Sequence, residues 1–255
     1  EIIAPMGVFD IGEYSFYSCI NVTSYSLPNT LSSIGQYAFA QNIALTNISI
    51  PDEVVLIGRY AFEKDNSLRT ISFGDDSKLA RIGFGAFADC GITSFRVPSN
   101  VSTIAQNAFA NCNELTNIVF AKNSKLANIT AYQFEGCSNI TNITFEQGSA
   151  LAQIQAHGFE GMAKLTSVDF GDAQLIEIDN FAFRFCESLS TLKLPSTLIN
   201  IGRFAFYNCK NLSQLNLPYG LEHIGKFAFL GASNCSIYFE AESLPMYLDE
   251  NWDYG

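Results

Sequence analysis

The sequence predicts an α/β repeat solenoid, with a parallel β-sheet on one face and short helical or 3₁₀ turns on the other. Three observations lead to this fold: a motif that recurs every 22 to 25 residues, a phenylalanine at one place in every copy, and a short alternating segment in the second half of the copies. A unit this small cannot bury its apolar face alone, so the copies must stack on one another.

The motif reads Ile-Gly-x-aromatic-Ala-Phe, and its Ile defines position one of each turn. Position six is Phe in all ten copies, and a column of stacked rings predicts the spine of the core. Position two is Gly in six copies, which predicts either a bend with positive φ or a close backbone approach. The copies begin at Ile11, Ile34, Ile57, Ile82, Ile104, Ile129, Ile154, Ile178, Ile201 and Ile224.

The second half of the unit reads apolar-x-x-apolar-x-apolar, often followed by Pro, as in Leu189-Ser-Thr-Leu192-Lys-Leu194-Pro195. Its last four residues alternate with the period of a strand, and proline then ends the strand because it cannot donate to a ladder. The period lies in the range of leucine-rich repeats. We therefore expect a right-handed superhelix with one parallel strand per turn, and a helical or 3₁₀ turn over segments such as Gly202 to Cys209.

Some turns replace the proline with a polar linker, such as Gly74-Asp-Asp-Ser-Lys78. Linkers of this kind follow Phe73, Phe120, Phe145 and Phe170. Insertions in a solenoid map to loops on one of its edges, so these segments predict edge loops.

The unit resembles the Treponema-pallidum-type leucine-rich repeats of BspA-like surface proteins, which read roughly Leu-x-x-Ile-x-Leu-Pro-x-x-Leu-x-x-Ile-Gly-x-x-Ala-Phe-x-x-Cys. The stretch from Leu189 to Cys209 satisfies most of that unit, and the resemblance covers residues 8–240. It implies a cell-surface or secreted protein of host-associated bacteria or parasitic protists. It also implies adhesion to host cells, matrix proteins or other microbes.

Two segments follow from the pattern: a repeat array over residues 1–240 and a C-terminal cap over 241–255. The cap contains Leu244-Pro-Met-Tyr247 and Asn251-Trp-Asp-Tyr254, and it resembles the terminal segment of the same family. An off-pattern last turn with one large aromatic is what a capping unit needs. Residues 1–10 contain no comparable cap, which leaves open that repeats precede them.

Composition excludes several partners. The net charge of −11 and the isoelectric point near 4.5 oppose attraction to nucleic acid or to anionic lipid surfaces. No apolar run is long enough to insert in a membrane, and the amino terminus lacks the order of a signal peptide. We expect a mature chain or an excised part of one, and a monomer.

The cysteines predict structure rather than chemistry. Six of seven occupy position nine of their turns: Cys19, Cys90, Cys112, Cys137, Cys186 and Cys209. A repeated position implies a repeated environment, so we expect an inward-facing column of reduced thiols. Cys235 is off register, which leaves an exposed thiol open.

No set of residues predicts catalysis, a metal site or a cofactor, so we expect no enzyme. His157 takes the aromatic place at position four, and His223 lacks a cluster of acids or thiols. Asp75 and Asp76 lack the series of oxygen ligands that calcium needs. Eight Asn-x-Ser/Thr sequons leave glycosylation open: Asn21, Asn47, Asn100, Asn128, Asn139, Asn142, Asn211 and Asn234.

Outward residues of the predicted strands are the candidates for binding, because the inward ones are committed to packing. One outward column is uniformly small and polar, whereas the next varies between turns and is free for recognition. Within this second column we select, as a candidate site on the concave face, Arg96, Val119, Thr144, Asp169, Lys193 and Asn216. The alternative is a plain solvated face.

These observations favour a cell-surface or secreted adhesion module that binds an extracellular protein or glycan of a host or microbe through the solenoid surface. The alternative is a structural spacer that projects other domains from the cell surface. The two differ in whether an exposed patch departs from a uniform polar stripe.

Overall fold

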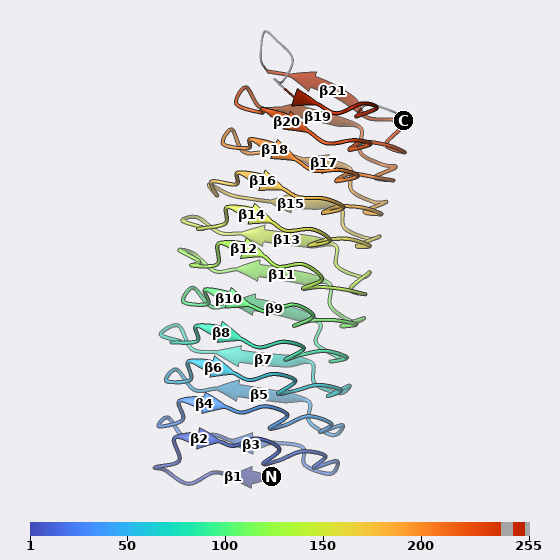
Figure 1. Ribbon diagram of the computed structural model, residues 1–255. Coiled ribbons are helices and arrows are strands. Elements are labelled where there is room, and N and C mark those ends of the chain that lie inside the picture. Colours follow the sequence, from blue (N-terminus) through green and yellow to red (C-terminus); the bar gives the residue numbers. More distant parts are fainter. Residues whose placement is uncertain (241–246, 253–255) are drawn as a thin grey trace.

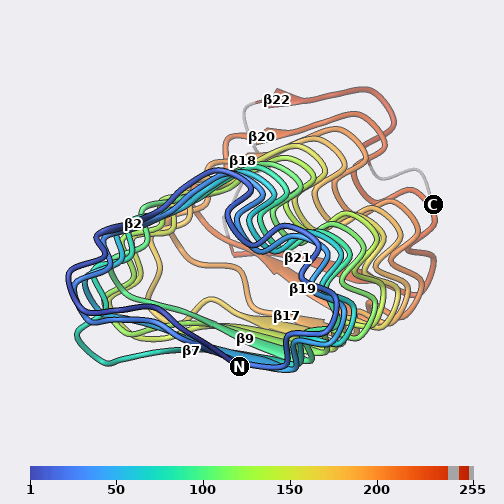
Figure 2. The same ribbon diagram turned by 90° about the horizontal axis from the view of Figure 1, so that it is seen from below.

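The computed structural model describes residues 1–240 and 247–252, and it shows turns stacked along one axis as a parallel β-solenoid (Figure 1). Each complete turn contributes two short strands. Seen along the axis, the turns superimpose around a common interior (Figure 2). All registered strand pairs are parallel.

The odd-numbered strands, here called the main sheet, are the alternating segments of the sequence pattern. Their bounds are β1 Ile2–Ile3, β3 Tyr25–Ser26, β5 Asn47–Ile50, β7 Thr70–Phe73, β9 Ser94–Val97, β11 Asn117–Phe120, β13 Asn142–Phe145, β15 Ser167–Asp169, β17 Thr191–Leu192, β19 Gln214–Leu217 and β21 Ser236–Phe239.

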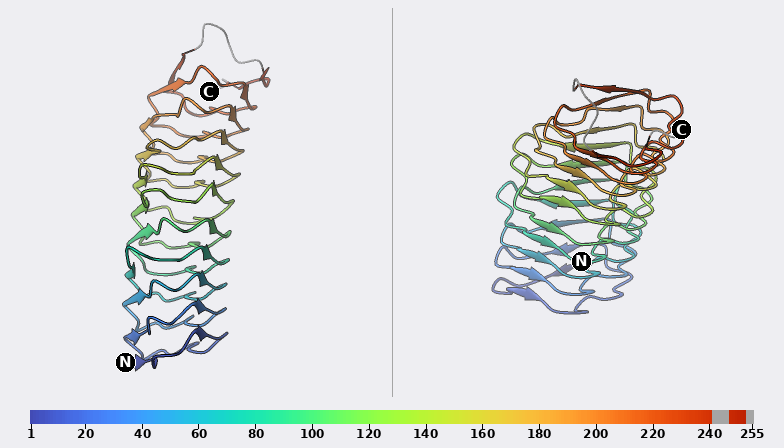
Figure 3. Two further views of the ribbon diagram at one scale, coloured as in Figure 1. Left: turned by 90° about the vertical axis from the view of Figure 1, so that its left-hand side faces the viewer. Right: turned by 45° about the horizontal axis from the view of Figure 1, so that its top comes forward.

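The even-numbered strands, here called the side sheet, carry position one of the repeat motif and run up another face (Figure 3). Their bounds are β2 Asp10–Ile11, β4 Ser33–Ile34, β6 Leu56–Ile57, β8 Arg81–Ile82, β10 Thr103–Ile104, β12 Asn128–Ile129, β14 Gln153–Ile154, β16 Glu177–Ile178, β18 Asn200–Ile201, β20 His223–Ile224 and β22 Tyr247–Leu248.

The expected helical or 3₁₀ turns are wrong: the described residues contain no helix, and segments such as Gly202 to Cys209 are chains of tight turns. Phe204 and Asn208 have φ values of 54° and 57°, which a right-handed helix cannot contain. The N–H of Phe204 donates to the carbonyl of Lys226 in the next turn at 3.1 Å, and Phe206 donates likewise to Ala228 at 2.8 Å. Hydrogen bonds to the next turn therefore alternate with local ones, such as Tyr207 N–H to the Phe204 carbonyl at 3.1 Å, in place of the continuous series that a helix would form within itself.

The phenylalanines of position six form the predicted column. Nine of the ten rings are buried, and only Phe16, in the first repeat, is partly exposed. Successive ring centroids lie 5.2 to 6.2 Å apart along the whole array. Ring stacking at this spacing is favourable beyond the burial of apolar area alone.

Trp252 lies at the carboxyl end of this column. Its ring meets Phe229 edge-on at 6.3 Å and Phe239 at 5.8 Å. Nearby, β22 pairs with β20, so residues 247–252 keep the hydrogen-bonding register of the array. The remaining residues of the proposed cap, 241–246 and 253–255, lie outside the described part of the chain.

Glycine at position two allows the backbones of neighbouring turns to approach closely, which is one of the two reasons expected from the sequence. A Cβ on Gly58 would stand 2.6 Å from the carbonyl carbon of Gly35 in the preceding turn. Positive φ belongs instead to position four, where Tyr14, Tyr37 and Tyr60 have values between 53° and 56°. Their rings stack at 4.9 Å, which helps to hold an unfavourable backbone conformation.

Five of the six position-nine cysteines are confirmed as inward and structural, and their thiols act as hydrogen-bond donors; Cys19, in the first repeat, is only partly buried. Position nine of each turn faces the carbonyl of the position-six Phe in the preceding turn. Cys90 donates to Phe62 at 2.9 Å, and four further cysteines repeat this bond: Cys112, Cys137, Cys186 and Cys209. All described cysteines are free, and Cys235 is half-buried, where burial raises its pKa to about 11.

Two polar residues replace cysteine in this column, and the sequence analysis missed both. Asn42 keeps the donor role, since its amide donates to the Phe16 carbonyl at 2.9 Å while its oxygen accepts from Tyr25 at 2.6 Å. Asp65 is fully buried; its Oδ1 accepts from the Asn42 N–H at 2.8 Å, but its Oδ2 has no partner. Burial raises the pKa of Asp65 to about 8, so the carboxyl is largely protonated at neutral pH.

Asp65 is therefore expected to make stability depend on pH. The folded state holds a proton that the unfolded state releases near its ordinary pKa of 3.8, so the free energy of unfolding should fall as pH rises from about 4 to about 8. The slope from this one group approaches about 1.4 kcal/mol per pH unit inside that window. Urea unfolding across pH should show this slope in the wild type and lose it in Asp65→Cys, which restores the usual donor. Asp76→Asn, at an exposed acid, is the control, and equal slopes in all three proteins would contradict the assignment.

Gly58→Ala is expected to destabilise the array by about 1–3 kcal/mol, because its Cβ meets backbone that cannot move aside. Gly220→Ala is the matched control, since the nearest atom to its Cβ is the Ser196 carbonyl oxygen at 3.7 Å. Urea unfolding of both variants measures the difference, and equal stabilities would show that the turns can separate freely.

Candidate binding face on the main sheet

The candidate residues lie in one row across the outer surface of the main sheet. Val119 is registered opposite both Arg96 and Thr144, and Thr144 opposite Asp169. Lys193 directly follows β17, and Asn216 lies in β19 opposite Tyr238 of β21. The side chains between them in sequence, such as Phe95 and Ile118, are buried. The alternation expected from the sequence therefore brings these residues onto one surface.

Arg96 is not free on this surface. Its guanidinium spans the intervening turn and binds Glu146 with two bonds, Nη1–Oε1 at 2.7 Å and Nη2–Oε2 at 2.9 Å. Glu146 also accepts from the N–H of Lys122 at 2.9 Å. The hydrogen bond from Arg96 lowers the pKa of Glu146, and the same bond raises the pKa of Arg96. Sequence reasoning missed Glu146, because nothing in the chain marks a partner fifty residues away.

Proline decides where neighbouring strands of the main sheet pair. In several turns the residue after the strand donates to the preceding turn, as Ala121 does to Val97 at 3.1 Å and Glu240 to Leu217 at 3.0 Å. The ladders closed in this way contain four registered pairs. Five other turns place proline there, which has no N–H to donate: Pro28, Pro51, Pro98, Pro195 and Pro218.

The main sheet is interrupted or reduced before each of these five prolines. No ladder joins β3 to β5 or β7 to β9 among the described strands. Two registered pairs join β1 to β3 and β15 to β17, and only one, Thr191 with Gln214, remains between β17 and β19. The strand-ending proline thus also weakens pairing with the turn before it.

Two clefts open on the outer surface at these interruptions. The first, of about 400 Å³, lies between β7 and the turn of Pro98, and its lining includes the buried Ile71, the partly buried Phe73, Arg96 and Lys122. The second, of about 510 Å³, surrounds β17 and is lined by three of the candidate residues, Asp169, Lys193 and Asn216. Val119 and Thr144 lie on the intact ladders between the two clefts.

A family model described as "BspA type Leucine rich repeat region (6 copies)" matches residues 1–116, 57–178 and 152–245, which together span nearly the whole chain. The chain belongs to the BspA-type leucine-rich-repeat family. No significant match was found among curated protein sequences.

Solved structures share this BspA-type fold. The leucine rich repeat protein of T. pallidum is 28% identical over 64% of this chain and 76% of its own, with a TM-score of 0.56. The pneumococcal vaccine antigen PcpA is 20% identical over 98% of this chain and 69% of its own, with a TM-score of 0.57. A leucine-rich repeat protein from Bacteroides ovatus is 24% identical over 97% and 73%, with a TM-score of 0.51.

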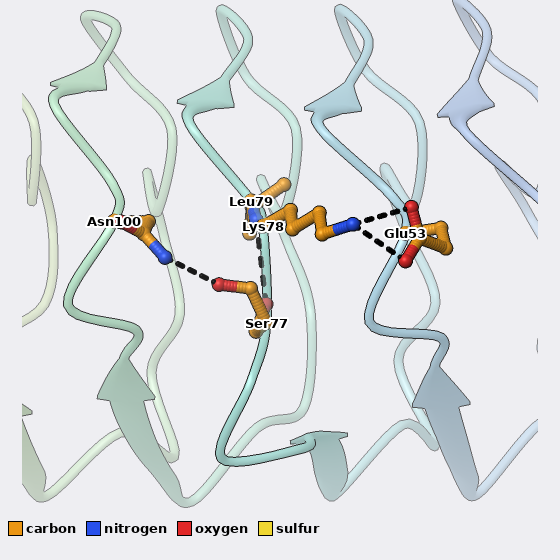
Figure 4. Close-up of polar contacts among 5 residues, drawn as sticks. All are labelled: Glu53, Ser77, Lys78, Leu79 and Asn100. Atoms are coloured by element: carbon orange, nitrogen blue, oxygen red, sulfur yellow. Dashed lines mark hydrogen bonds and ion pairs between the residues drawn. The ribbon is translucent and has the colours of Figure 1, made fainter.

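The edge loops of this BspA-type array are tied to one another by polar contacts. Lys78 reaches Glu53 in the preceding turn at 2.6 and 2.8 Å, and Asn100 donates to the carbonyl of Ser77 at 2.8 Å (Figure 4). The Ser77 hydroxyl in turn accepts from the N–H of Leu79 at 3.4 Å. The linkers that the sequence places on an edge are therefore held in register with their neighbours.

The two histidines are structural in their contacts. The ring of His157 stacks between Tyr132 at 4.6 Å and Phe181 at 4.9 Å, as expected for an aromatic substitute, and its Nδ1 contacts Glu160. His223 lies 3.7 Å from a carboxylate oxygen of Asp249, a pairing that the sequence did not suggest.

Neither a metal site nor a membrane span is seen in the described ranges. Over residues 1–240 and 247–252, no group of three or more His, Cys, Asp or Glu side chains is placed to hold a metal ion. The same ranges hold no helix of the length and apolarity that crossing a bilayer requires.

Arg96 and Glu146 are expected to be energetically coupled. A double-mutant cycle with Arg96→Ala and Glu146→Ala should give about 0.2–1 kcal/mol at low salt, because an exposed bidentate pair gains only modest Coulomb energy. The coupling should fall in about 1 M salt, where the screening length is about 3 Å. Urea unfolding measures each corner of the cycle, and additive effects at low salt would show that the pair is not formed in solution.

Proposed function

We propose that this BspA-type chain is a cell-surface or secreted binding module that recognises a host or microbial protein or glycan. The observation that carries this proposal is the row on the main sheet. Its residues differ from turn to turn although packing does not require them to differ, and two clefts interrupt the surface that they share. A plain solvated face would be uniform in both respects.

The mode of binding follows from what the row contains. It is rich in polar and charged side chains and poor in the aromatic anchors that dominate tight protein interfaces. Contacts spread along many turns give avidity without any single strong contact. We therefore propose a monomeric module whose affinity accumulates along the array.

The same proposal treats the chain as a binder and not as an enzyme, and assigns it no cofactor. The alternative function is a spacer that projects other domains. The polar ties between edge loops favour it, since they would stiffen a rod.

The test is a binding screen against extracellular matrix proteins, mucins and glycans, with the triple variant Arg96→Ala/Asp169→Ala/Lys193→Ala. Specific binding that falls by about tenfold or more in the variant would support the main-sheet face, because three charged contacts are removed at once. The control is Glu53→Ala/Lys78→Ala, which removes an exposed ion pair on the edge loops.

Each outcome points to one location. Binding that survives the triple variant but fails in the control would move the site to the edge loops. A folded array that binds nothing would favour the spacer, and turnover of any substrate by the purified chain would overturn the proposal as a whole.

A further inference from the structure

The cleft around β17 lies where the main sheet is reduced on both sides of one strand that stays paired to both neighbours. Pro195 follows β17 and Pro218 follows β19, so neither turn can donate the hydrogen bond that closes the ladder elsewhere. Two registered pairs remain on one side of β17 and one on the other. The resulting cleft has a volume of about 510 Å³, within the range of about 300–1,000 Å³ typical of small-molecule sites.

The reduced ladder exposes groups that other turns keep covered. Leu192 and Leu194 are 7% and 8% exposed, whereas the equivalent Leu215 and Leu217 of the next turn are at 0%. No donor among the described residues reaches the carbonyl of Leu194, because Pro218 stands where an N–H would be. An unpaired backbone carbonyl beside a cleft is an available acceptor for a ligand.

Side chains around the cleft are also uncommitted. Among the described residues, the hydroxyls of Thr191 and Ser213 and the ammonium of Lys193 have no hydrogen-bond or ion-pair partner. Asn216 accepts one bond, from Gln214 at 3.1 Å, and keeps both of its own donors free. The lining therefore offers hydroxyl and ammonium donors together with carboxylate and amide acceptors.

We propose that this cleft binds a neutral oligosaccharide. Each saccharide hydroxyl can both donate and accept a hydrogen bond. This suits a lining in which hydroxyl, amide and charged groups provide donors and acceptors side by side. Two acids, Asp169 and Glu240, and one base, Lys193, line the cleft, so no excess of positive charge selects a polyanion. The proposal rests on the proposed binding function and names its ligand class.

An extended peptide suits the cleft less well. Strand addition needs a free sheet edge with a row of unpaired backbone groups. Here β17 is flanked by β15 and β19 and remains paired to both, so no edge is open for a further strand. The cleft at Pro98 is weaker as a site, because Arg96 at its rim is already bound to Glu146.

Saturation-transfer NMR and calorimetry on the full chain test the proposal, with maltotriose, cellotriose, xylotriose, mannotriose and chitotriose as probes. At least one trisaccharide should bind, and Thr191→Ala/Asn216→Ala should weaken it by about fivefold or more, since two hydrogen-bonding side chains are removed. The matched control is Thr70→Ala/Ser49→Ala, which removes outward side chains on β7 and β5 and should leave binding unchanged.

Pro218→Ala tests the structural cause separately. The new N–H of residue 218 should donate to the Leu194 carbonyl and gain protection from hydrogen exchange, and saccharide affinity should fall. Protection without a loss of affinity would overturn the role of the ladder gap. Free exchange of the residue 218 amide would also overturn this role, because it would show that proline is not what keeps the ladder open.

The outcomes separate this inference from the proposed function. No binding of any trisaccharide, or binding equally weakened in the control, overturns the saccharide site. If a matrix protein or an unstructured peptide binds and is lost in the Arg96/Asp169/Lys193 variant while no saccharide binds, the binding function stands and only the ligand class proposed for the cleft fails.

Discussion

The constraint on which the structure depends is the stacking of one phenylalanine per turn. A ring spacing of 5.2 to 6.2 Å along the array requires every turn to bring the chain back over the same point, with nearly the same rise along the axis. Strand pairing on two faces and turn-to-turn hydrogen bonds on the third keep that rise per turn constant. Glycine at position two and an aromatic residue at positive φ at position four follow from it, because the backbone must bend sharply and approach its neighbour closely.

The cysteine column satisfies backbone carbonyls that the phenylalanine stacking buries. Each position-six carbonyl is buried beside the rings, and a thiol from the next turn donates to it at about 3 Å. Asn42 can replace the thiol because its amide also donates. A charged Asp65 cannot donate, and its buried position is compatible with the column only when the carboxyl holds a proton.

Proline links the fold to the surface on which we place binding. Its missing N–H ends a strand and also removes the bond by which that turn would pair with the turn before it. The sheet therefore alternates between continuous stretches, as from β9 to β13, and interrupted ones, as around β17. The side sheet is itself broken between β10 and β12, but this break does not coincide with a gap in the main sheet, where β9, β11 and β13 stay paired. Because the core is held by rings and by the side sheet, the main sheet can be interrupted elsewhere without separating the turns.

The sequence by itself determined the repeat, its stacked phenylalanines, the inward cysteines and the outward row, because these depend on residue type and period alone. It did not predict the turn conformation, since a helix and a chain of tight turns place Ala and Phe at similar spacings and only contacts with the next turn decide between them. It also could not place Glu146 against Arg96, or the Oδ2 of Asp65 where no donor reaches it, because both depend on which residues meet across turns. The clefts were decided by tertiary structure for the same reason: each proline is visible in the sequence, but its effect falls on the carbonyl of another turn.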